Sequence, residues 1–262
     1  MSFQDADGPE VEHHEALYSG FAQEHFAKPA VRAFRRHLVA RILRVTGASS
    51  SSSVLSLGCG IGDTELLLAP FVKRIVGLDL SPAGIRQARL DAERAGIANA
   101  EFLQGDLESA RFPEASFDVV IAVFFLHHLQ DQQLHELVRL LAQLLSSKGV
   151  FYSLDPNRYR LSGAIGRLLV PNLMKKYQTP DERQLVPSAI ERLFAGHGFA
   201  ARHRMYDFLS TPLAGLFPSA RLAYRVARLL DNVLVRTPLL NRIGSNFELL
   251  ARRRDLFRYN RE

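Results

Sequence analysis

Residues 54–62 read VLSLGCGIG, an apolar run that leads directly into three glycines at alternate positions. A short apolar run is typical of a buried strand, and glycines permit a sharp turn that a ligand can approach closely. A helical pattern begins at Thr64, and the first turn of a helix presents N–H groups without intrahelical partners. The stretch therefore predicts a strand, a ligand-binding turn and a helix.

The alternation of strand and helix continues along the chain. Apolar runs predict strands at residues 54–57, 74–80, 100–104, 117–124, 150–154, 200–207 and 246–251. Helical patterns lie at residues 64–72, 81–95, 132–145 and 188–196. Apolar strands that alternate with helices indicate an α/β fold, with a doubly wound, mostly parallel sheet covered on both faces.

The composition is that of a globular protein, with 262 residues of which 47% are hydrophobic and 23% charged. The single cysteine excludes a disulfide framework, and the nine histidines show no zinc-binding spacing with it, so we expect no metal site. The longest apolar run, residues 119–126, is far shorter than the roughly 20 residues that span a bilayer. Since the acidic N-terminus also lacks the features of a signal peptide, we expect a cytoplasmic protein.

A carboxylate follows the glycine turn at the end of the second predicted strand. Asp79 lies 17 residues after Gly62, where a carboxylate can accept hydrogen bonds from both hydroxyls of a ribose. The dinucleotide fingerprint G-x-G-x-x-G requires a third glycine where this chain has Asp63, and an aspartate would repel a pyrophosphate. An NAD-dependent oxidoreductase is therefore the disfavoured alternative.

Five segments, in order and in register, resemble the class I S-adenosylmethionine-dependent methyltransferases of the small-molecule type. They are VLSLGCGIG (54–62), IVGLDLS (75–81), FLQGDLES (102–109), FDVVIAVFFLHHL (117–129) and GVFYSLDPN (149–157). The resemblance implies a Rossmann-like sheet of seven strands, one of them antiparallel. It also implies methyl transfer from S-adenosyl-L-methionine, with S-adenosyl-L-homocysteine as the product.

The resemblance also implies a set of cofactor-binding residues. The turn, with Gly58, Cys59, Gly60 and Gly62, would pass the methionine part, and Asp79 would hold the ribose. Leu80, Asp106 and Leu107 would contact the adenine, whereas Val123 and Phe124 would face the methionine end. The family usually has an acidic residue where this chain has Ser56, which offers no charge to the cofactor's ammonium group. We therefore expect weaker cofactor binding, and a non-catalytic binding subunit is a second alternative.

Two adjacent histidines follow the fourth predicted strand, near the expected position of the transferred methyl group. Imidazole titrates near neutral pH, so His128, or with less support His127, could act as a general base. The alternative is that both residues pack or cap the start of the next helix. Tyr18 and Asp155 are further candidates for a catalytic role.

Two other kinds of methyl transfer are not expected. The N/D-P-P-Y/F signature of some amine methyltransferases is absent, and Cys59 lies within the cofactor turn, so no cysteine is available for methylation at cytosine C5.

The charge of the chain is divided unevenly along its length. Residues 1–150 hold 14 Lys and Arg against 18 Asp and Glu, whereas residues 151–262 hold 19 against 9. We divide the chain into a flexible lead (1–14), N-terminal helices that cover the cofactor site (15–47) and a methyltransferase domain (48–262). Basic insertions at 157–186 and 208–243, each of net charge +4, then supply most of the positive charge beside the expected acceptor pocket.

An amphipathic basic helix is predicted within the second insertion, over residues 219–235. Arg221, Arg225 and Arg228 share one face, and an apolar stripe formed by Leu222, Val226, Leu229 and Val233 occupies another. Such a helix could be a lid that packs its apolar stripe on the domain. It could also contact an anionic membrane or a lipid-like substrate. Nucleic acid is the third interpretation, which we do not expect because no RNA-binding module accompanies the charge.

Overall fold

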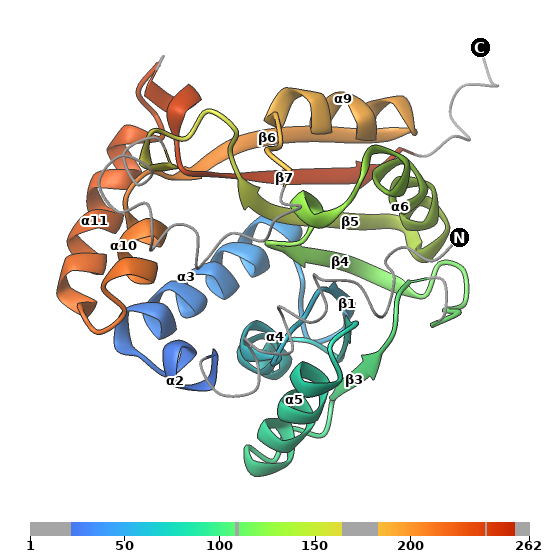
Figure 1. The fold of residues 1–262 in the computed structure, drawn as a ribbon. Helices are drawn as coiled ribbons and strands as arrows, with labels where there is room; N and C mark the ends of the chain where they lie inside the picture. The colour runs from blue at the N-terminus through green and yellow to red at the C-terminus, as the bar shows by residue number, and fades with distance from the viewer. Residues whose placement is uncertain (1–21, 108–109, 164–182, 239, 255–262) are drawn as a thin grey trace.

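The computed structural model describes residues 22–107, 110–163, 183–238 and 240–254. Its strands form one sheet in the order β3-β2-β1-β4-β5-β7-β6, in which β7 is antiparallel to both neighbours and the other pairs are parallel. The strands are β1 (Ser53–Leu57), β2 (Arg74–Asp79), β3 (Ala100–Gln104), β4 (Phe117–Val123), β5 (Leu145–Pro156), β6 (Phe199–Asp207) and β7 (Asn246–Arg253). This confirms the expected doubly wound sheet of seven strands (Figure 1).

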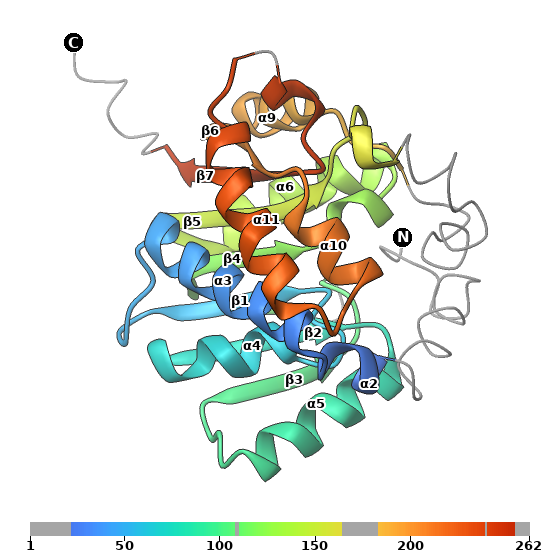
Figure 2. The ribbon, with the colours of Figure 1, turned by 90° about the vertical axis from the view of Figure 1, so that its left-hand side faces the viewer.

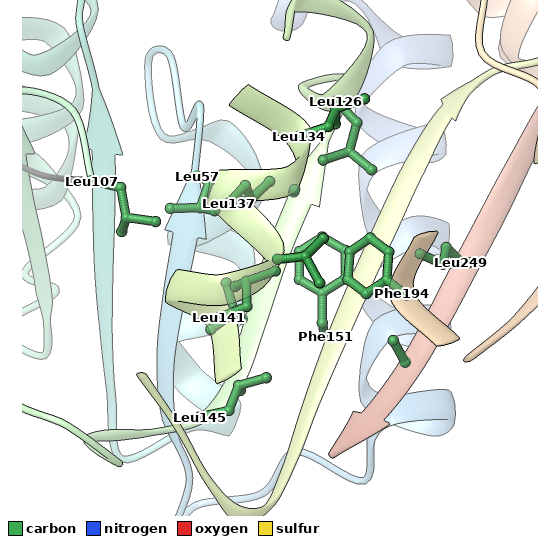
Figure 3. Packing of buried hydrophobic residues seen from close by; sticks show 14 of the residues in the cluster. Leu57, Leu107, Leu126, Leu134, Leu137, Leu141, Leu145, Phe151, Phe194 and Leu249 are labelled. Atoms are coloured by element: carbon green, nitrogen blue, oxygen red, sulfur yellow. The ribbon is translucent and has the colours of Figure 1, made fainter. Parts of the chain in front are cut away.

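Helices cover both faces of the sheet, because its central strands are buried on both sides. The helices are α2 (Ala22–Phe26), α3 (Pro29–Thr46), α4 (Asp63–Leu68), α5 (Pro82–Arg94), α6 (Asp131–Leu144), α9 (Pro187–Gly196), α10 (Ser210–Leu216) and α11 (Arg221–Leu234). Helices α6 and α9 pack on one side, where Phe151 of β5 stacks on Phe194 at a ring-centroid distance of 5.0 Å (Figure 3). Residues of α3, α4, α10 and α11 share a second core with the sheet. The alternation predicted from the sequence is therefore confirmed.

Several boundaries differ from those predicted. Strand β4 ends at Val123, because Phe124 takes a left-handed backbone conformation with φ of 55°. The helix expected over residues 64–72 is instead α4 followed by a 3-10 turn at Ala69–Phe71, which contains Pro70. Residues 1–14 and Tyr18 lie outside the described part of the chain, as does most of the insertion at 157–186.

Helices α10 and α11 lie at the edge of the sheet where the parallel strands end. Strand β6 runs in the same direction as β5, and α10 begins three residues after β6. The contacts of α10 and α11 with α3 complete this side of the molecule (Figure 2). The carboxyl edge of the sheet is where open α/β folds bind their ligands.

The orientation of α11 overturns one interpretation of the basic helix. Its buried residues are Tyr224, Ala227 and Asp231. The apolar stripe is instead exposed, by 75% at Leu222 and 68% at Leu229. The interpretation of α11 as a lid that packs this stripe on the domain is therefore wrong.

Candidate cofactor and acceptor site

The glycine turn is fixed against the second strand by its own backbone. Gly58 and Cys59 both donate their N–H groups to the carbonyl of Leu78, at 2.8 and 3.1 Å. Gly58 has φ of 68°, and a Cβ placed there would lie 2.6 Å from the Phe125 ring. Gly62 has φ of 74°, and its Cβ would lie 2.7 Å from Phe102. Side chains are excluded at both positions, because neighbouring rings fill the space and the backbone is left-handed, so the turn requires glycine there.

Asp79 connects the end of β2 to the glycine turn. Its carboxylate accepts the N–H of Gly60 at 2.7 Å through one oxygen and that of Ser81 at 2.9 Å through the other. Two backbone donors therefore hold this side chain in one orientation beside the turn. A carboxylate oxygen has more than one lone pair, so both oxygens keep capacity for ligand hydroxyls.

A buried carboxylate, that of Glu65, lies beside Ser56, the residue that stands where the family usually has an acidic residue. The Ser56 hydroxyl donates to Glu65 Oε1 at 2.5 Å, and both side chains are buried. Glu65 Oε2 has no hydrogen-bond partner within the described residues. Burial raises the pKa of Glu65 to about 7, and the charge of Asp63 adds to this, whereas the Ser56 hydrogen bond and Arg35 oppose it.

Glu65 was not among the residues expected in the site, although the sequence contains a signal for it. Glu65 and Leu68 are three residues apart in α4 and therefore share a helix face, which is the buried one. An acidic residue on the apolar face of a helix, directly after a ligand-binding turn, indicates a functional carboxylate. Helix α4 thus places a buried carboxylate next to Ser56.

An ion pair anchors the N-terminal helix α3 to the end of the glycine turn. Arg35 Nε lies 2.6 Å from Asp63 Oδ2, and both side chains are at most 20% exposed. Phe34, the adjacent residue of α3, contacts Phe124 with ring centroids 6.2 Å apart. Helix α3 therefore lies against both the glycine turn and the end of β4, and the covering of a cofactor by residues 15–47 stays a prediction.

The other cofactor residues expected from the resemblance lie along the same sheet edge. Leu80 directly follows β2, and Asp106 and Leu107 follow β3 by two and three residues. Val123 ends β4, and the N–H of Phe124 donates to the Leu154 carbonyl at 2.7 Å. The sheet topology thus brings these residues together, but their contacts with a cofactor stay predictions.

The two histidines occupy a short 3-10 turn, Leu126–His128, after β4. His127 Nδ1 lies 3.1 Å from Asp155 Oδ1, and these residues are 5% and 0% exposed. The His128 ring lies beside that of His127, with centroids 4.0 Å apart. The histidine in contact with a buried carboxylate is therefore His127, whereas sequence analysis preferred His128 as the base.

The fold and the arrangement of these residues indicate the class of protein to which the chain is similar. The strand order with an antiparallel β7, the glycine turn after β1, and the carboxylates at the end of β2 and after β3 are the features that the resemblance to class I S-adenosylmethionine-dependent methyltransferases implies. Residues 54–149 match the family model described as a methyltransferase domain. This part of the chain is therefore similar to a methyltransferase domain.

Individual relatives agree with this assignment. The chain is 31% identical over 114 residues to the uncharacterized methyltransferase YcgJ of Bacillus subtilis, a match that covers 44% of each protein. It is 29% identical over 175 residues to a protein of Mycolicibacterium smegmatis described as a "probable S-adenosylmethionine-dependent methyltransferase", covering 67% of this chain and 63% of that one. The chain thus matches less than two thirds of the length of either curated relative.

Solved structures share the fold over most of the chain. The crystal structure of YcgJ superposes with a TM-score of 0.57 at 22% identity, covering 84% of this chain and 99% of that one. Magnesium protoporphyrin IX methyltransferase from Synechocystis, solved with bound S-adenosylhomocysteine, gives a TM-score of 0.60 at 15% identity and covers 95% and 96%. At these identities the likeness concerns the fold.

Proposed function

We propose that the protein transfers the methyl group of S-adenosylmethionine to a small hydrophobic or anionic acceptor and releases S-adenosylhomocysteine. The observation that supports this is the convergence, on one sheet edge, of the glycine turn, Asp79 and the His127–Asp155 pair. When bound, the cofactor supplies an electrophilic methyl group on a positively charged sulfur. The acceptor atom forms a bond to this methyl group, and the cofactor sulfur keeps the electron pair of the bond that breaks.

The buried residues of the site fit this cofactor. Glu65 Oε2 is buried without a hydrogen-bond partner among the described residues, and such an atom costs free energy unless a ligand satisfies it. An ammonium group supplies both a positive charge and N–H donors. In this proposal Glu65 replaces the acidic residue that Ser56 displaces, and the Ser56 hydroxyl orients its carboxylate. Glu65 would therefore compensate for the weaker cofactor binding that is expected from Ser56, which carries no charge.

His127 is the base in this proposal, and Asp155 is its positioning residue. Asp155 is completely buried, and its Oδ1 lies 3.1 Å from His127 Nδ1, so in this proposal it accepts the Nδ1–H and orients the ring, and the proton of the acceptor goes to Nε2. The N–H of Arg183 donates to the His127 carbonyl at 2.9 Å and fixes the backbone of the turn. General-base assistance requires an acceptor that loses a proton on methylation, such as a hydroxyl or an amine.

The acceptor class is inferred from the basic residues near the site. Arg228 of α11 lies over the ring of Tyr206, with its Cζ 4.7 Å from the centroid, and Tyr206 also contacts Phe34 of α3. Aromatic rings beside guanidinium groups suit an acceptor with an apolar body and an anionic group.

Incubation with methyl-labelled S-adenosylmethionine and fractionated cell extract tests the proposed function. We expect label in a small molecule, together with equimolar S-adenosylhomocysteine. Extraction into organic solvent at low pH, with return to water at high pH, would identify an acidic hydrophobic acceptor. Cofactor occupancy without any S-adenosylhomocysteine would instead support the binding subunit. Thermal stabilisation by NAD, and none by S-adenosylmethionine, would support the oxidoreductase.

A further inference from the structure

Helix α11 presents three different faces, which follow from its rotation of about 100° per residue. The first, with Tyr224, Ala227 and Asp231, is buried against the protein. The second holds Arg221, Arg225 and Arg228. The third is the apolar stripe. The arginines lie between this stripe and the buried face around the helix axis. The helix is thus held by one face and presents a basic and an apolar face side by side.

The apolar face is unusually exposed for side chains of this kind. The exposed fractions are 75% for Leu222, 50% for Val226, 68% for Leu229, 51% for Leu230 and 66% for Val233. Phe217, in the turn between α10 and α11, extends this surface with an exposed fraction of 57%. Contiguous exposed apolar side chains with basic neighbours mark a surface that contacts a membrane or another macromolecule.

The basic face forms part of a cavity of about 690 Å³ between α3 and α11. Five arginines line it, and among the described residues its lining contains no acidic side chain; they are Arg32, Arg36, Arg221, Arg225 and Arg228. His37 also lines it, and its pKa is lowered to about 4, first by burial and then by the charges of Arg228, Arg44 and Arg41. The cavity is therefore a positive environment suited to phosphate groups.

We propose that the apolar and arginine faces of α11, together with Phe217, bind the surface of an anionic phospholipid bilayer. The helix lies parallel to the surface, with Leu222, Leu229 and Val233 among the upper acyl chains. The exposed Arg221 and Arg225 contact headgroup phosphates, which bind guanidinium groups in a planar, two-bonded geometry. This pairing of charge with exposed apolar side chains favours a lipid surface as the occupant. The described part of the chain contains no helix long and apolar enough to cross a membrane.

This orientation turns the functional site toward the membrane. Helix α10 follows the carboxyl end of β6, and α11 lies beside it (Figures 1 and 2). The glycine turn follows β1 and His127 follows β4, at the same edge of the sheet. A hydrophobic acceptor dissolved in the bilayer would therefore be delivered to the side on which the methyl group is transferred. The lipid-binding proposal itself rests on α11 and does not require methyl transfer.

Co-sedimentation of the full chain with vesicles tests the proposal. Vesicles of phosphatidylcholine alone are compared with vesicles that also contain phosphatidylserine, at low and at high salt. We expect binding to the phosphatidylserine vesicles at low salt, and much weaker binding to phosphatidylcholine or at high salt. Absence of binding to phosphatidylserine vesicles at low salt would overturn the proposal, and so would equal binding to both kinds of vesicle.

Variants separate the two faces of the helix. Leu222→Ser and Leu229→Ser should each weaken vesicle binding by about tenfold, since each removes the burial of one leucine. Arg221→Glu with Arg225→Glu should abolish the preference for phosphatidylserine. The matched controls are Leu90→Ser on α5 and Arg192→Glu on α9, which are also exposed and should leave binding unchanged. Equal losses in the controls and the α11 variants would contradict the proposal. Because all these positions are exposed, a thermal melt of each variant should match that of the parent chain.

Discussion

The hydroxyl of Ser56, in the first strand, donates a hydrogen bond of 2.5 Å to Glu65, in the helix that follows the glycine turn. Both side chains are buried, and a second oxygen of Glu65 has no partner among the described residues. The carboxylate beside Ser56 is thus carried by the helix and not by the strand. This relationship leads directly to tests of how the cofactor is held.

Replacement of Glu65 should weaken cofactor binding. Glu65→Gln removes the charge but keeps the shape, so we expect the Kd for S-adenosylmethionine to rise by about ten- to a hundredfold. Isothermal titration calorimetry measures this, with the exposed Glu101→Gln as the matched control. The double variant Ser56→Asp, Glu65→Gln returns the carboxylate to the strand and should recover most of the affinity. If Glu65→Gln binds as tightly as the parent chain, Glu65 does not contact the cofactor.

Cofactor binding should depend on pH through Glu65. Its pKa of about 7 in the free protein falls when an ammonium group binds next to it, so binding near neutral pH releases a proton. Affinity should therefore increase as pH rises toward about 7 and level off above it. Calorimetry in two buffers of different ionisation enthalpy reveals the released proton. The Glu65→Gln variant should lose this dependence, and its persistence there would assign the proton to another group.

The stability of the free protein should also depend on Glu65. The folded-state pKa is raised from 4.5 to about 7, so the folded protein binds this proton more tightly than the unfolded chain does. The stabilisation is complete below pH 4.5 and is lost as pH rises through about 7, by an amount on the order of 3 kcal/mol. Urea unfolding across this range measures it against Glu65→Gln, whose stability should change less. Parallel pH profiles for the two proteins would contradict the raised pKa.

His127 and Asp155 should affect turnover more than cofactor binding. Loss of a general base lowers kcat by about a hundred- to ten-thousandfold, so His127→Ala should fall in this range. Asp155→Asn should lower kcat by a smaller factor and shift the pH profile, while the Kd for S-adenosylmethionine stays within about threefold. His128→Ala is the comparison that matters most. A larger loss in His128→Ala than in His127→Ala would return the base to the residue that the sequence favoured.

Asp231 should stabilise the pair of helices that carries the exposed surface. This buried carboxylate accepts the N–H groups of Phe208, Leu209 and Ser210, each at 3.0 Å, and so joins α11 to the start of α10. Asp231→Ala leaves these buried donors without a partner and should lower the free energy of unfolding by about 2–4 kcal/mol. Urea unfolding checks this, with the exposed Asn232→Ala as a control that should change little. A loss no greater than that of the control would contradict this role.

The architecture was predictable because buried strands and amphipathic helices leave strong local patterns. All seven strands are expected from the sequence, since each of β1 to β7 contains a short apolar or alternating run. The left-handed conformation of Phe124 was not predictable, because it depends on packing at the end of β4. Contact between Glu65 and Ser56 was also missed, since it requires the rotation of α4 relative to the sheet.

Helix α11 shows why an amphipathic pattern does not reveal which face is buried. The sequence separates arginines from leucines, and burial of the leucines is the usual outcome. Here the helix is held instead by Tyr224, Ala227 and Asp231, because three backbone N–H groups satisfy the buried carboxylate. These three hydrogen bonds to Asp231 require α10 to begin beside α11, and the local pattern of apolar residues in α11 does not determine where α10 begins.

Calorimetric titration with S-adenosylmethionine and with S-adenosylhomocysteine is the most direct test of the central claim. The account predicts that both bind at one site per chain, and that Glu65→Gln weakens both because both carry the ammonium group. Absence of binding by either compound at millimolar concentration, in a protein whose thermal melt shows it to be folded, would contradict the assignment of the site.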